Sequence, residues 1–165
     1  MSGNEIQELQ EGLRSAREAV LSAIEGISEA DAQEVPEPGE WTVAQLMGHV
    51  TEVQSFWVSK AILITKEDDP NVARNAAEGE LRAASVAGNT QDSVAGLRQK
   101  MIAANDAAVA SVGGIDSKDL DRVGHRGEGR PVSAGQLIQS LASHLREHAG
   151  QITETRRMVR ERKQG

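Results

Sequence analysis

The sequence predicts an all-α protein, a four-helix bundle that forms a single domain over residues 1–165. Four long stretches repeat apolar residues at steps of three and four, which gives one apolar stripe on an α-helix. The composition agrees, since alanine, leucine, glutamine, glutamate and arginine are plentiful and Phe56 is the only phenylalanine. The length is that of one domain. Helices with one-sided stripes bury them best by packing together as a bundle.

The first helix is expected from about Asn4 to Ile27. Its stripe consists of Ile6, Leu9, Leu13, Ala16, Val20, Ile24 and Ile27. The run EADAQEVPEPGE ends this helix, because Pro36 and Pro38 lack a backbone donor and favour extended conformations. This run therefore predicts a linker to the next helix.

The second helix is expected to begin at Thr42, whose hydroxyl caps the first turn while Gln45 completes a capping box. Its stripe consists of Val43, Leu46, Met47, Val50, Val53, Trp57 and Ala61, and it fades near the run KEDDP. The polar, alanine-rich segment 71–89 then predicts a long loop between the second and third helices. A short extra helix is expected in it, around Ala76 to Ala84.

The third helix is expected from about Gln91 to Val112, and Gly113 and Gly114 end it. Its stripe consists of Val94, Leu97, Met101, Ala104 and Ala108. The glycine-rich run IDSKDLDRVGHRGEGRP follows, and we expect a loop or a small hairpin there, at one end of the bundle. No stretch of the chain has a convincing strand pattern.

The fourth helix is expected to begin with Ser133 as cap and Gln136 as its capping-box partner, and to run towards Glu161. Its stripe consists of Leu137, Ile138, Leu141, Leu145, Ala149 and Ile152. The basic run RRMVRERK near its end favours a solvated helix terminus, whose cations complement the helix dipole. A nucleic-acid or lipid contact is the weaker interpretation, because the run is short.

Charge and composition limit which partners and which metal ligands the chain can have. The net charge of −7 argues against nonspecific binding of nucleic acid. No apolar stretch reaches the ~20 residues that span a bilayer, and no basic region followed by an apolar run marks a signal peptide. Cysteine is absent, which excludes disulfides and thiolate ligands and favours a reducing cytoplasm. Any metal site must therefore use histidine, carboxylate or water.

His144 and His148 are the most informative residues of the chain. Four residues advance a helix by about 400°, so both imidazoles leave the same face one turn apart. His49 lies in the second helix, and a helical wheel places all three rings at the edges of their apolar stripes. Three imidazoles with an open position are a recurring arrangement in reactive metal centres. The alternative is that each is a hydrogen-bonded boundary residue. His125, in the glycine-rich run, is expected to be exposed.

Two segments, GEWTVAQLMGHV and PVSAGQLIQSLASHLREHAGQI, resemble the DinB-like (DinB/YfiT) family of bacterial proteins. The resemblance lies in the pair Trp41–Thr42, in His49 seven residues further on, and in His144 and His148 in the last helix. It implies a four-helix bundle whose metal site is open to a cleft, with these three histidines as ligands. It also implies a metal-dependent hydrolase, or a thiol transferase or isomerase that uses mycothiol or bacillithiol, and a homodimer.

Three neutral imidazoles would leave a divalent ion its full charge and one open position. Zinc is expected, with nickel or iron as alternatives, because imidazole suits all three. Bound zinc lowers the pKa of its water to about 7, or it holds a low-molecular-weight thiol as thiolate. Without a cysteine of its own, the chain narrowly favours thiol transfer to a small-molecule substrate. A non-catalytic stress-response or interaction module, with a structural, vestigial or absent metal, is the alternative function.

Side chains near the histidines would orient the rings by accepting their outer N–H groups. Gln45 and Glu52 are the candidates beside His49, although capping and surface charge explain them better than a role at the site. Glu147 points about 100° away from His148 on the helix, so a solvated position is expected for it.

Overall fold

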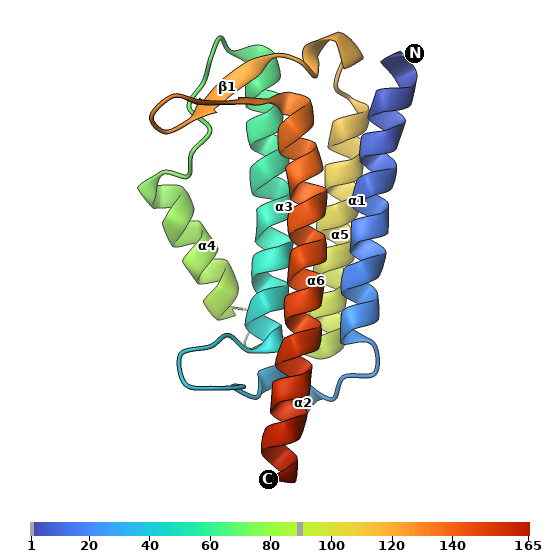
Figure 1. Ribbon diagram of the computed structural model, residues 1–165, viewed down its shortest axis with the longest axis vertical. Coiled ribbons are helices and arrows are strands. Elements are labelled where there is room, and N and C mark those ends of the chain that lie inside the picture. Colours follow the sequence, from blue (N-terminus) through green and yellow to red (C-terminus); the bar gives the residue numbers. More distant parts are fainter. Residues whose placement is uncertain (1, 89–90) are drawn as a thin grey trace.

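The computed structural model describes residues 2–88 and 91–165, so Asn89 at the end of the expected loop lies outside the described residues. It confirms the all-α four-helix bundle, which is shown in Figure 1. The four long helices are α1 (Ser2–Ile24), α3 (Val43–Lys66), α5 (Val94–Gly113) and α6 (Ala134–Gln164). No helix of the described residues is long and apolar enough to cross a membrane.

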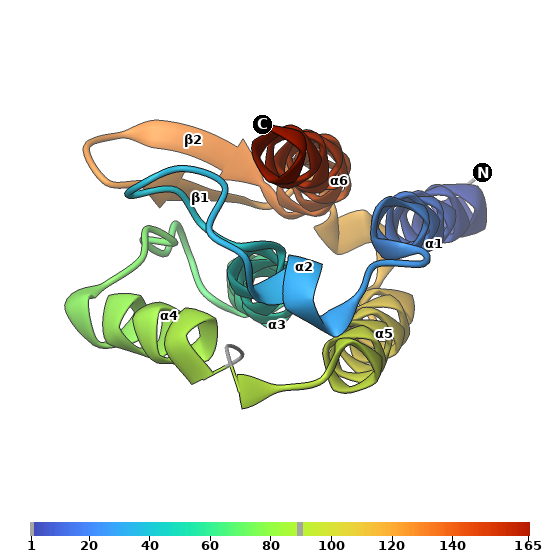
Figure 2. The ribbon, with the colours of Figure 1, turned by 90° about the horizontal axis from the view of Figure 1, so that it is seen from below.

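The four helices pack as a square in which α1 and α3 both contact α5 and α6 (Figure 2). The colours of Figure 1 show that α1 and α6 run in one direction and α3 and α5 in the other. Helix α3 is therefore antiparallel to α6. This arrangement brings the first half of α3 beside the middle of α6, where the histidines lie.

Two connections contain short helices. The short helix α2 (Glu29–Gln33) lies in the proline-containing linker between α1 and α3. Helix α4 (Ala76–Gly88) returns along the outside of α3, so the expected short helix is longer than predicted (Figure 2). This return is needed because α3 and α5 run in the same direction, and the chain must travel back before α5 begins.

Capping residues set the helix boundaries. Both expected capping boxes form, with Thr42 and Gln45 at the start of α3 and with Ser133 and Gln136 at the start of α6. Helix α5 begins three residues later than predicted, because Ser93 caps it and accepts a hydrogen bond from the amide of Gly96.

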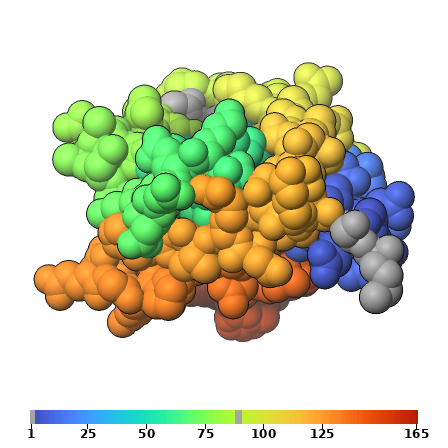
Figure 3. Space-filling view, turned by 90° about the horizontal axis from the view of Figure 1, so that it is seen from above, coloured from blue at the N-terminus to red at the C-terminus, as the bar shows by residue number. Residues whose placement is uncertain are grey.

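The glycine-rich run forms a small hairpin, one of the two structures expected there, although no stretch of the sequence shows a convincing strand pattern. A 3-10 turn, η2 (Ser117–Asp119), precedes β1 (Val123–Arg126), which pairs antiparallel with β2 (Arg130–Ser133). Gly127 and Gly129 close the turn with positive φ angles of 58° and 79°, which glycine adopts without strain. Figure 3 shows the hairpin, in orange, beside the segment that follows α3. Strands of this length are too short to show an alternating pattern.

The basic end of α6 is not simply solvated, as the sequence suggested. Figure 1 shows α6 extending beyond the other three long helices. There Arg156 donates hydrogen bonds to the carbonyls of Ala23 and Glu25, and Arg162 donates to the carbonyl of Val35. These cations therefore fasten the linker between α1 and α3 to α6. Arg160 remains exposed, as expected.

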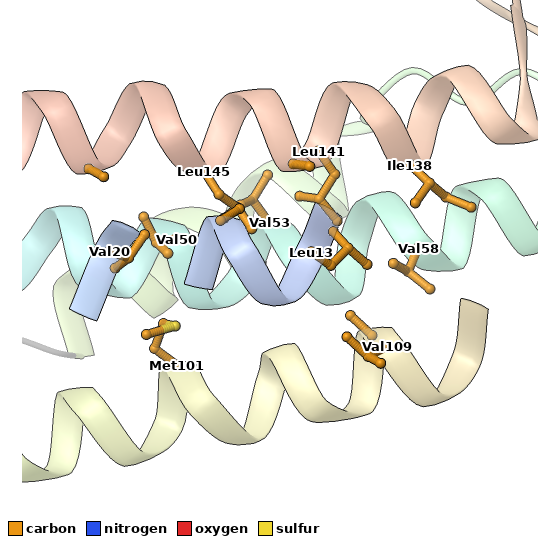
Figure 4. Packing of buried hydrophobic residues seen from close by; sticks show 14 of the residues in the cluster. Leu13, Val20, Val50, Val53, Val58, Met101, Val109, Ile138, Leu141 and Leu145 are labelled. Carbon is orange, nitrogen blue, oxygen red and sulfur yellow. The ribbon is translucent and has the colours of Figure 1, made fainter. Parts of the chain in front are cut away.

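The stripes of the four long helices meet in one core. Figure 4 shows side chains of this core from all four helices, among them Leu13, Val50, Met101 and Leu141. Two amides interrupt it, since Gln54 and Asn105 are both 0% exposed. The Asn105 Nδ2 donates to the carbonyl of Leu13 and to Gln54 Oε1, so this amide joins α1, α3 and α5.

We expect Asn105→Ala to lower the free energy of unfolding by about 1–3 kcal/mol, because it leaves Gln54 Oε1 and the Leu13 carbonyl buried without their donor. Urea denaturation followed by circular dichroism measures this change. Gln99→Ala is the control, because Gln99 is exposed on the same helix. Equal stability of the two variants would contradict the structural role of the buried amide.

Candidate metal centre

Three histidines from two helices meet at one point of the bundle. His49 comes from α3, and His144 and His148 come from consecutive turns of α6. The Nε2 atoms of His49 and His144 lie 3.4 Å apart, and those of His144 and His148 lie 3.0 Å apart. Two nitrogens on one tetrahedral zinc ion lie about 3.3 Å apart, so the cluster has the spacing of a metal site.

The surroundings of the rings keep them neutral. His49 is only 5% exposed, and burial lowers its pKa to about 3, with further contributions from His148 and Arg82. His144 and His148 are half-buried, and burial lowers the pKa of both rings. His49 thus lies deeper than the stripe edge where the helical wheel placed it. Neutral imidazole is the form that binds metal ions, so the protonation state fits the donor set.

Two residues of α6 contact the outer nitrogens of its histidines. His148 Nδ1 lies 2.9 Å from Gln151 Oε1, and His144 Nδ1 lies 3.8 Å from a carboxylate oxygen of Glu147. An amide oxygen only accepts, so Gln151 holds the proton of His148 on Nδ1 and leaves Nε2 free. Gln151 is not among the residues predicted to orient the rings, although its position three residues after His148 places it on the same face. Glu147 is 76% exposed, as expected, but it reaches His144.

The two candidates proposed beside His49 form their hydrogen bonds and ion pairs with other groups. Gln45 completes the capping box of α3, and Glu52 forms an ion pair with Arg74 at 2.5 Å. The outer nitrogen of His49 instead faces α4, where the Nε of Arg82 lies 3.3 Å from Nδ1. Because arginine only donates, His49 Nδ1 accepts this hydrogen bond.

His125 lies outside the cluster. It is half-buried on β1, rather than exposed as predicted, and its Nδ1 lies 3.1 Å from a carboxylate oxygen of Asp69. Among the described residues, His49, His144 and His148 form the one group of histidines and carboxylates that could share an ion. Neither His125 nor a carboxylate supplies the fourth ligand that would close such a site.

Two tryptophans of the described chain pack against the triad. Trp57 stacks on His144 with 5.4 Å between ring centroids and 14° between planes, and Trp41 and His49 meet edge to face with 5.6 Å between centroids. The sequence places Trp57 in the apolar stripe of α3, and nothing there shows that its ring covers a histidine of another helix. These contacts restrict the rotation of both imidazoles.

A cleft of about 920 Å³ opens beside the triad. It lies between the first half of α6 and the hairpin, and its walls include Trp57, Arg126, Arg130 and His144. A small molecule in this cleft would therefore lie next to one of the three clustered imidazoles. The arrangement combines neutral nitrogen donors, restrained rings and access from solvent.

We expect acid to destabilise the metal-free protein through His49. This ring has a pKa of about 3 in the folded chain and an ordinary pKa near 6.5 when unfolded, so only the unfolded state takes up its proton between these values. Stability is therefore lost as the pH falls through this range, by at most about 1.4 kcal/mol per unit from this ring. Urea denaturation at several pH values measures the slope. His49→Gln should have a shallower slope, and an unchanged slope would contradict the assignment.

Comparison with known proteins agrees with the fold. The solved structure of YfiT from Bacillus subtilis, described as a probable metal-dependent hydrolase with an unusual four-helix bundle topology, is similar with a TM-score of 0.75. The two sequences are 15% identical, and the match covers 92% of this chain and 86% of YfiT. A search among curated proteins found no significant match. The sequence profile of the DinB superfamily matches residues 12–152, and the chain therefore belongs to this superfamily.

Proposed function

We propose that the protein is a metal-dependent enzyme that acts on a small molecule, with His49, His144 and His148 as the ligands of one divalent ion. The observation that carries this proposal is the convergence of three Nε2 atoms from rings that burial keeps neutral. A hydrogen bond between two neutral rings accounts for one pair of these nitrogens, whereas a single ion accounts for all three at once. The proposed ion is zinc, with nickel or iron as alternatives, because three imidazoles suit each of them.

The bound ion would supply a Lewis acid that makes water, or a thiol, nucleophilic near neutral pH. The residues of the chain have separate tasks. Gln151 holds the proton of His148 on the outer nitrogen, and Trp57 fixes the plane of His144. The cleft admits the substrate next to His144.

Hydrolysis is the reaction we propose first. YfiT, which shares the fold, is described as a probable metal-dependent hydrolase, and water needs no binding site of its own. Thiol transfer, which the sequence analysis narrowly favoured, is the second candidate. The absence of cysteine supports it, because any sulfur nucleophile must come from a low-molecular-weight thiol.

Metal content tests the proposal directly. Protein purified without an affinity tag should contain close to one equivalent of metal by elemental analysis. Ala in place of His49, His144 or His148 should remove most of it, because two imidazoles bind far more weakly than three. His125→Ala is the matched control and should keep the metal, since His125 lies outside the cluster.

Protein that neither contains metal nor gains thermal stability from added zinc or nickel would refute the enzyme and favour a non-catalytic interaction module. If metal is present, carboxylic esters and amides assayed with and without added thiol separate the two reactions. Turnover without thiol supports hydrolysis. Turnover that requires thiol supports transfer.

We expect Gln151→Ala to weaken zinc binding roughly 10-fold, because His148 would lose the acceptor that holds its proton on Nδ1. Competition with a fluorescent zinc chelator measures the dissociation constant. Gln139→Ala, an exposed glutamine of the same helix, should leave it unchanged. Equal affinities for both variants would contradict the orienting role of Gln151.

A further inference from the structure

Two arginines of the hairpin face each other. Arg126 and Arg130 are direct partners in the register of β1 and β2, so their side chains leave the same face of the hairpin. Like charges placed directly opposite each other destabilise a strand pair. Both side chains also line the cleft beside His144. The hairpin therefore places an unfavourable pair of cations on the wall of the candidate site.

No carboxylate compensates these charges within the described residues. Neither Arg126 nor Arg130 forms an ion pair in residues 2–88 or 91–165, although Glu128 lies between them in sequence. Glu147 is the one acidic residue that lines the cleft, and its carboxylate lies towards His144. The cleft is therefore lined by two arginines and one glutamate, in a chain whose net charge is −7.

Aromatic contacts link the arginine pair to the triad. The guanidinium of Arg126 lies over the ring of Trp57, 4.9 Å from its centroid, and Trp57 stacks on His144. The other side of the triad repeats this order, since Arg82 lies over Trp41 at 5.5 Å and Trp41 contacts His49. A guanidinium group that rests on a tryptophan ring, as that of Arg126 does, keeps its N–H edges available for an anion. The two tryptophan rings therefore hold the guanidinium groups of Arg126 and Arg82 in place relative to the imidazoles.

We propose that the cleft binds a small organic carboxylate between the guanidinium groups of Arg126 and Arg130, and that this molecule is the substrate of the reaction proposed above. The second part rests on that proposed function. A carboxylate matches the planar fork of arginine and relieves the repulsion between the two cations. An uncharged molecule of the same shape leaves both cations uncompensated, so the site discriminates by charge.

Succinate and its uncharged diamide, succinamide, test this site in metal-depleted protein by ligand-observed NMR titration. Removing the metal ensures that binding reports on the arginines and not on the ion. The wild-type protein should bind succinate roughly 10-fold more tightly than succinamide, in line with charge-assisted hydrogen bonds. Arg126→Gln should remove this preference without changing the affinity for succinamide. Arg126→Lys, which keeps the charge but not the fork, should retain part of it.

Arg98→Gln is the matched control. Arg98 is exposed on α5, which does not line the cleft, so this variant changes the net charge equally and should leave both affinities within twofold. Arg130→Gln gives a second test at the facing position, and circular dichroism verifies that each variant is folded. Absence of a preference for succinate in the wild-type protein would overturn the proposal. An equal loss in Arg98→Gln would also overturn it.

The two proposals fail in distinguishable ways. A chain that binds no metal but prefers succinate through Arg126 has the anion site without the proposed reaction. A chain that holds metal on the three histidines but does not distinguish succinate from succinamide has the metal centre with an uncharged substrate.

Discussion

The antiparallel contact between α3 and α6 is the constraint on which the candidate site depends. His49 lies early in α3, and His144 and His148 lie near the middle of α6, so one particular register of the antiparallel pair brings them together. The buried amide of Asn105 ties α3 to α1 and α5, because it donates to Gln54 of α3 and to the carbonyl of Leu13, and α1 and α3 both pack against α6. A shift of one helical turn would move a ligand by about 5.4 Å and separate the three nitrogens.

The hairpin, the end of α6 and helix α4 determine the surroundings of the contact between α3 and α6. The hairpin closes one end of the bundle and forms a wall of the cleft, while the basic end of α6 fastens the linker at the other end. Helix α4 allows α3 and α5 to run in the same direction and covers His49 with Arg82. The segments that connect the helices thus also shape the surroundings of the three histidines.

Much of this structure could be predicted from the sequence. Apolar periodicity located the four long helices, and Thr42 and Ser133 marked two of their starts, because stripes and caps are local signals. The same spacing placed His144 and His148 on one face. A small hairpin was one of two expectations for the glycine-rich run, but its strands are too short for the sequence to decide. Gln151 and Trp57 were not predicted as contacts of the histidines. Gln151 lies on the same helix face as His148, whereas the partner of Trp57 lies on another helix and leaves no trace in the local pattern.

The hydrogen bond from Arg82 to His49 has a consequence for the metal-free protein. Since Nδ1 accepts, the single proton of the neutral ring lies on Nε2, the atom that faces the other two histidines. His49 must therefore transfer this proton to Nδ1 before Nε2 becomes a ligand, and Nδ1 then no longer accepts from Arg82. One attachment of α4 is thus incompatible with ligation through Nε2. Loading the triad and loosening this helix therefore go with the same tautomer of His49, and the attached helix goes with the other.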